Sequence, residues 1–138
     1  MGEAPPSENC LRSPPEELLR AVAEFNAGAW FDCHETLEEL WAGEKGELRD
    51  FYQGVLQIAV ALHHWREGNF KGALLLLRTG GEFLQRVGSV CRSLDVKALI
   101  RDAGRFRDRL EALGPERRAE AEDLVPRIRL VEGEGNSG

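Results

Sequence analysis

Apolar residues recur every three or four positions along most of this chain, which is the spacing of one face of an α-helix. The longest such stripe consists of Phe51, Val55, Ile58, Leu62 and Trp65. Strict alternation of apolar and polar residues, the pattern of a half-buried strand, is not evident in any segment. The pattern therefore predicts an all-α fold, a compact array or bundle of about four to five helices in a single domain.

The helix boundaries follow from residues that start or stop helices. The predicted helices span residues 14–26, 31–41, 47–67, 70–87 and 96–113. Ser13 as N-cap, Pro14 at the first helical position and Glu16 predict a capping box at the start of the first helix. Asp95 is a candidate cap for the last helix, whereas Gly80–Gly81 weakens the case for continuity in the fourth.

The regions on either side of the helices lack this periodicity. Residues 1–12 are rich in Pro, Ser and Gly and predict a flexible leader, followed by a helical domain over residues 13–113. Residues 114–138 predict an irregular C-terminal extension with a disordered end, because Pro126 disfavours a long helix. The apolar residues expected to dock back on the helices are Leu124, Val125, Ile128, Leu130 and Val131.

Composition and charge narrow the range of partners. The formal net charge of −6 and the pI of about 5.2 argue against broad electrostatic capture of nucleic acid or an anionic membrane. The arginines after residue 100 are interleaved with acids, which is typical of a salt-bridged solvated surface. No apolar run is long enough to span a bilayer, and no secretory signal is evident. Cys10, Cys33 and Cys91 show no paired spacing, so the sequence indicates no disulfide framework and favours a reducing, cytoplasmic setting.

The segment "FDCHETLEELW" carries the candidate chemistry. His34, Glu38 and Trp41 stand at i, i+4 and i+7, so they share one helix face, and Glu35 and Glu39 lie on a neighbouring, solvated face. The segment is not the H-E-x-x-H motif of metalloproteases, and the chain contains no E-x-x-H tetrapeptide of the di-iron type. Two interpretations stay open: a structural polar network between helices, or a metal or ligand site.

The long third helix supplies the candidate facing partners. Gln53, Gln57 and His64 recur beside its apolar stripe, and polar groups on so hydrophobic a helix need hydrogen-bond partners. His63 lies on the neighbouring stripe and takes the place of His64 if the helix phase differs.

These residues predict a polar pocket between the second and third helices that holds a divalent metal ion or a small polar ligand. The predicted metal ligands are His34, Glu38 and His64, which leave open positions for water. The residues predicted to shield the site or to bind its ligand or cofactor are Trp41, Gln53 and Gln57.

Two long stretches, "FNAGAWFDCHETLEELW" and "RDFYQGVLQIAVALHHWREGNFKGALLLL", carry a family resemblance. They resemble the family named domain of unknown function 309, whose pattern H-x-x-x-E-x-x-W is matched here by His34, Glu38 and Trp41. Further similar positions are Phe25, Asn26, Gly28, Phe51, Gln53, Gly54, Gln57, Asn69, Gly72 and Ala73. The resemblance covers residues 14–87 and implies a helical fold with metal binding by the motif, but no established reaction.

The alternative prediction is a protein-interaction module without catalysis, in which the motif only fixes helix packing. Apolar residues on more than one face of the third and fourth helices favour it, and it requires an exposed apolar patch or a homodimer. A protein partner or a second copy of the chain would then replace the small-molecule ligand. The sequence leaves open whether the protein is an enzyme.

Overall fold

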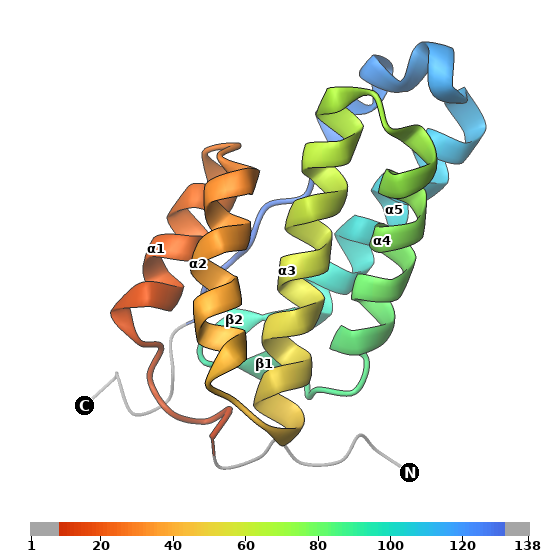
Figure 1. Ribbon diagram of the computed structural model, residues 1–138. Coiled ribbons are helices and arrows are strands. Elements are labelled where there is room, and N and C mark those ends of the chain that lie inside the picture. Colours follow the sequence, from red (N-terminus) through yellow and green to blue (C-terminus); the bar gives the residue numbers. More distant parts are fainter. Residues whose placement is uncertain (1–8, 132–138) are drawn as a thin grey trace, which may run out of the picture.

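A computed structural model describes residues 9–131, which form a mostly helical fold with one small hairpin (Figure 1). The elements are α1 (Glu16–Asn26), α2 (Trp30–Ala42), α3 (Gly46–Glu67), α4 (Phe70–Leu84), β1 (Val90–Cys91), β2 (Leu94–Asp95), α5 (Val96–Leu113) and the 3₁₀ helix η1 (Pro115–Leu124). The predicted fold class is confirmed. The predicted disordered end and most of the predicted flexible leader, residues 1–8, lie outside the described residues.

Helices that follow one another in sequence pack side by side. Figure 1 shows α3 between α2 and α4, with α1 beyond α2 and α5 behind α4. The predicted apolar stripe of α3 lies in the core, where Phe51, Ile58 and Leu62 are fully buried. Within the described part of the chain, no helix combines the length and the hydropathy needed to cross a bilayer.

Glycines let α3 and α4 approach closely. A Cβ added at Gly54 would lie 2.6 Å from Leu84 Cγ, and one added at Gly80 would lie 2.9 Å from Ile58 Cγ1. α4 continues through the Gly80–Gly81 pair, and Gly80 allows the close contact with α3. The helix ends at Leu84 rather than at Val87.

The structure confirms the predicted N-cap of α5 but not that of α1. Asp95 caps α5 by accepting a hydrogen bond from the Ala98 backbone N–H (2.9 Å), as predicted. The predicted capping box of Ser13 is wrong, because α1 begins at Glu16 and Pro15 occupies the N-cap position with extended backbone. The reason is steric: Pro14 precedes another proline, and that position disfavours the α conformation.

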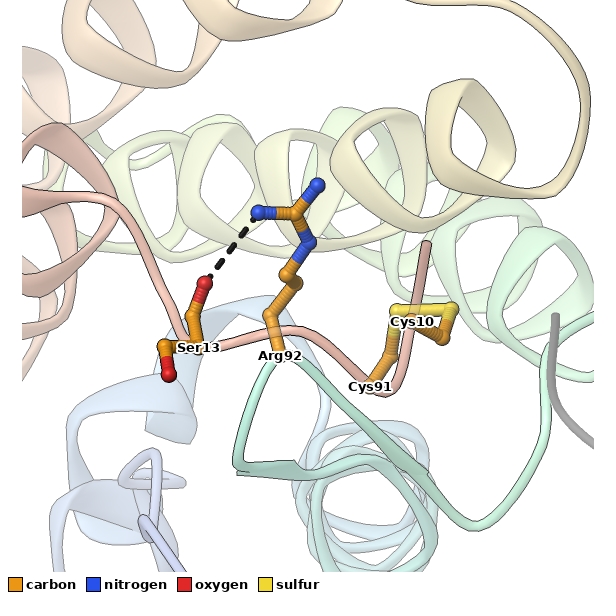
Figure 2. Close-up of a disulfide and its surroundings, with 4 residues drawn as sticks. All are labelled: Cys10, Ser13, Cys91 and Arg92. Carbon is orange, nitrogen blue, oxygen red and sulfur yellow. Dashed lines mark hydrogen bonds between the residues drawn. A yellow bond between two sulfur atoms is a disulfide. The ribbon is translucent and has the colours of Figure 1, made fainter. Parts of the chain in front are cut away.

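A small hairpin follows α4, and a disulfide joins it to the segment before α1. Val90–Cys91 pairs with Leu94–Asp95, and the intervening Arg92 and Ser93 have positive φ angles of 52° and 67°. The strands are too short to show alternation in sequence. Figure 2 shows the disulfide between Cys10 and Cys91, which corrects the expectation drawn from the cysteine spacing. The cysteines therefore no longer support the predicted reducing compartment.

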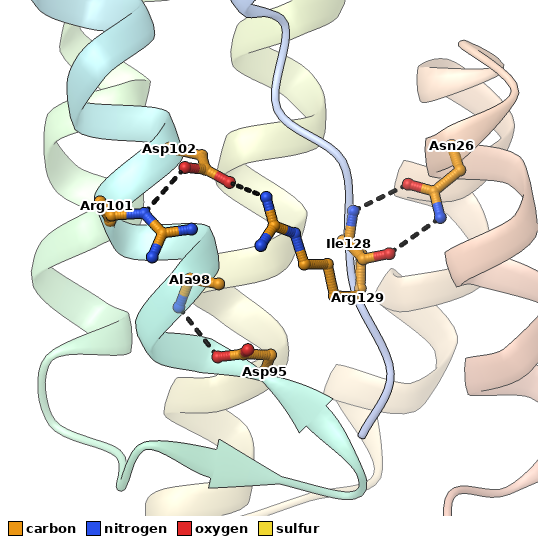
Figure 3. Close-up of polar contacts among 7 residues, drawn as sticks. All are labelled: Asn26, Asp95, Ala98, Arg101, Asp102, Ile128 and Arg129. Carbon is orange, nitrogen blue, oxygen red and sulfur yellow. Dashed lines mark hydrogen bonds and ion pairs between the residues drawn. The ribbon is translucent and has the colours of Figure 1, made fainter. Parts of the chain in front are cut away.

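The segment after η1 has an extended backbone and runs back across the helices (Figure 3). The Asn26 side chain forms two hydrogen bonds with the backbone of Ile128, one to its N–H (2.8 Å) and one to its C=O (2.9 Å). On the other side, Arg129 contacts Asp102 of α5, and Leu130 forms a bridge with Leu94. Ile128, one of the apolar residues predicted to dock back on the helices, is buried in the core.

Candidate functional site

The His34–Glu38 pair lies on the outer surface of α2. His34 Nε2 is 3.2 Å from Glu38 Oε2, and the two side chains are 26% and 58% exposed. The adjoining face of α2 is buried and includes Trp30, Cys33 and Leu37. Burial raises the pKa of the Cys33 thiol to about 12, so this cysteine is a small core residue. The motif pair is therefore presented to solvent while its helix is anchored in the core.

One stripe of α3 lies along the motif helix. Near the N-terminus of α2, the ring of Phe31 lies 5.7 Å from that of His63, and near its C-terminus Arg49 stacks on Trp41 at 4.1 Å. Arg49, Leu56 and His63 follow at seven-residue spacing and so share one side of α3. Gln53, four residues after Arg49, is half-buried at the edge of this stripe.

We call this surface the motif face. It consists of Phe31, His34, Glu38, Trp41, Arg49, Leu56 and His63, with Gln53 at its edge. Phe31 is 52% exposed and its ring lies 5.9 Å from the ring of His34, so it stands between two imidazoles. His63 Nδ1 is buried and has no hydrogen-bond partner among the described residues. Sequence reasoning did not single out Phe31 or Arg49, although Phe31 precedes His34 by three residues, which is a helical neighbour spacing.

The structure places two of the predicted site residues elsewhere. Gln57 accepts a hydrogen bond from Thr79 Oγ1 of α4, and His64 lies at the end of α3 with its Nδ1 3.4 Å from Asn69 Nδ2. Consecutive residues of a helix are about 100° apart, so of two adjacent histidines only one faces α2. That residue is His63, the alternative that the sequence left open.

The predicted metal ligands do not form a complete site. In the described residues, no group of three or more His, Cys, Asp or Glu side chains is arranged to hold a metal ion. His34 and Glu38 alone form a pair of possible donors, 3.2 Å apart. Two donors on adjacent coordination positions of one ion are about 3 Å apart, since each lies about 2.0–2.2 Å from the metal. The pair thus fits a partial coordination sphere with open positions.

Polar contacts between helices use residues outside the motif. Thr36 Oγ1 donates to Glu24 Oε1 at 2.8 Å and joins α2 to α1, and the contact between Thr79 and Gln57 joins α4 to α3. The contact between His34 and Glu38, by contrast, stays within α2.

A family comparison assigns the stretch that contains this surface. Residues 18–76 match the model of the family described as Domain of unknown function (DUF309). The matched stretch contains every residue of the motif face, together with Asn26 and Gly28, and it ends within α4.

Two curated relatives extend the comparison. The chain is 37% identical over 73 residues to the uncharacterized protein YpuF of Bacillus subtilis (strain 168), which is 51% of this chain and 42% of the relative. It is 40% identical over 55 residues to an uncharacterized protein of Aquifex aeolicus (strain VF5), which is 39% of this chain and 16% of the relative. The chain therefore spans less than half the length of either relative.

Proposed function

We propose that the protein is a small binding module whose motif face holds one divalent metal ion between His34 and Glu38, with water or a bound ligand in the remaining coordination positions. The observation that carries this proposal is the 3.2 Å separation of the imidazole Nε2 and the carboxylate Oε2 on an accessible surface. An imidazole and a carboxylate are ligands that zinc and similar ions accept.

The neighbouring side chains suit a polar ligand of that ion. Phe31 stands beside His34, and the Arg49 guanidinium on Trp41 supplies a positive charge at the other end of the motif face. Gln53 at the edge offers an amide donor and an acceptor. A metal held by two protein ligands keeps several positions open, as sites that bind or activate a ligand do.

An interaction module without metal has less support from the exposed side chains. The large apolar residues exposed in the described part of the chain come from separate segments: Leu11, Leu19, Phe31, Leu75, Val90 and Leu130. Of these, Phe31 belongs to the motif face. We therefore assign the binding role to the motif face rather than to an apolar patch.

The direct test is zinc binding by untagged protein, measured by calorimetry and by metal content after dialysis. We expect His34→Ala and Glu38→Ala each to abolish binding, because each removes one of two protein ligands. Glu35→Ala and Glu39→Ala are matched controls, since they remove carboxylates from the neighbouring face of the same helix and leave binding unchanged. His64→Ala is a further control for the histidine that lies away from the motif face.

Two results would overturn the proposal. One is wild-type protein that binds no zinc, nickel or manganese at millimolar concentration. The other is zinc binding that survives both motif substitutions. Thermal unfolding of each variant separates loss of a ligand from loss of the fold.

A further inference from the structure

A cavity of about 680 Å³ lies at the end of the helices where α1 turns into α2, and no residue of the motif face lines it. Its walls come from that turn, from the C-terminal end of α3, from η1 and from the segment after η1. The volume is in the range of small-molecule sites, about 300–1,000 Å³. We call it the arginine pocket, because Arg66, Arg118 and Arg127 line it.

Backbone carbonyls hold the three arginines in place. Arg66 donates to the C=O of Gly28 (2.7 Å), and Arg127 donates to that of Asn26 (3.2 Å). Arg118 donates to the C=O of Pro115 (3.0 Å). A guanidinium has five N–H donors, so each side chain keeps donors for another acceptor. A carbonyl also fixes the position of the group without neutralising its charge.

None of these three arginines has an ion-pair partner among residues 9–131. The neighbouring Arg117 differs, because its Nε and Nη2 both donate to the carboxylate of Glu120. One acid, Glu122, lines the pocket, so three guanidinium charges and one carboxylate give the lining a formal charge of +2. This is the opposite sign to the net charge of the chain, −6.

Two tryptophans, only 5% and 8% exposed, form part of the apolar lining of the pocket, beside Phe25, Val125 and Pro126. Trp30 and Trp65 pack edge to face with ring centroids 6.2 Å apart, and Arg66 stacks on the ring of Trp30 at 4.5 Å. Trp65 Nε1 donates to the C=O of Arg118, whereas Trp30 Nε1 is buried with no acceptor in residues 9–131. The pocket thus combines unpaired positive charge with aromatic surface.

We propose that the arginine pocket binds a small organic phosphate, with a phosphate monoester held by the guanidinium groups and a flat apolar body against the apolar lining. The planar fork of a guanidinium matches the oxygens of a phosphate or a carboxylate. The formal charge of +2 favours the phosphate, because a phosphate monoester carries between about −1.5 and −2 near neutral pH.

The test is calorimetry with phenyl phosphate as the probe. Benzoate keeps the ring with a single charge, inorganic phosphate keeps the charge without the ring, and phenol keeps the ring without the charge. We expect phenyl phosphate to bind more tightly than any of the three. Arg66→Gln, Arg118→Gln and Arg127→Gln should each weaken it by about tenfold or more, the usual effect of losing a charge-assisted hydrogen bond.

Two further variants make the test independent of folding. Glu122→Gln should strengthen phenyl phosphate binding, because it removes the negative charge from the lining, and a damaged fold does not produce tighter binding. Arg117→Gln is the matched control in η1 and should leave the affinity unchanged, since Arg117 is paired with Glu120 and lies outside the lining.

Three results would overturn the proposal. Phenyl phosphate that binds no better than phenol would show that the charge is not recognised. An equal loss in Arg117→Gln would show that only the overall charge matters. Benzoate that binds as tightly as phenyl phosphate would assign the pocket to carboxylates instead.

Discussion

The motif face and the arginine pocket share two helices, but they are assembled differently. The motif face uses α2 and α3, which are joined by a short turn and pack against each other, so its residues come from one local pair of helices. The arginine pocket also needs Arg118 and Arg127, from segments that return to the helices after α5. The difference indicates that one site depends on a local pair of helices and the other on docking of the C-terminal segment.

The two sites meet at consecutive residues of α2. Trp30 is buried beside Arg66, whereas Phe31 is half exposed beside His34 and His63. The step of about 100° between neighbours on a helix is what directs them to different surfaces.

The largest expected effect comes from damage to the helix that both sites use. Gly54→Val should lower the free energy of unfolding by about 3 kcal/mol, because its side chain would overlap Leu84 and the backbone oxygen of Gly80. Both zinc and phenyl phosphate binding should weaken, since α3 carries residues of both sites. Gly81→Ala is the control: nothing lies within 4 Å of its Cβ, so stability should rise by up to about 1 kcal/mol. Urea denaturation measures both, and equal stability in the two variants would contradict the packing argument.

A smaller change should separate the two sites. Asn26→Ala removes both hydrogen bonds to Ile128 and should lower the free energy of unfolding by about 2 kcal/mol. Phenyl phosphate binding should weaken because the C-terminal segment loses its anchor, while zinc binding stays at the wild-type level. Asn26→Asp keeps the acceptor for the Ile128 N–H and should show a smaller loss. If zinc binding were lost and phenyl phosphate binding kept, the motif face and not the arginine pocket would depend on docking of the C-terminal segment.

The smallest expected effect is confined to the motif face. Arg49→Ala removes the guanidinium that stacks on Trp41 and should cost about 0.5–1 kcal/mol of stability. Tryptophan emission should change, whereas phenyl phosphate affinity should not. Arg49→Lys keeps the charge without the planar stack and should retain part of the stability. A change in phosphate affinity in either variant would show that the two sites are coupled.

The sequence predicts the helices well because their apolar stripes are long and regular, as on α3. The predictions from sequence are wrong where a single residue decides where a helix begins or which side chain faces its neighbour. Pro15 shifts the start of α1, and a phase difference of one residue exchanges His64 for His63 at the motif face. Strands of two residues carry too little pattern to be recognised.

The arginine pocket could not be predicted from spacing at all. Asn26 and Arg127 are 101 positions apart in sequence, and their contact depends on how the C-terminal segment folds back. In the sequence, Arg117 and Arg118 look equivalent. The fold distinguishes them, since one is paired with Glu120 and the other lines a cavity.

The bond between Cys10 and Cys91 makes a covalent ring of the chain between them. The whole DUF309 stretch, and with it the motif face, lies inside this ring. A single cut by a protease in the turn between α2 and α3 would therefore leave one connected molecule until the disulfide is reduced. A cut after Leu113 would instead detach Arg118 and Arg127 from the ring, even under oxidising conditions.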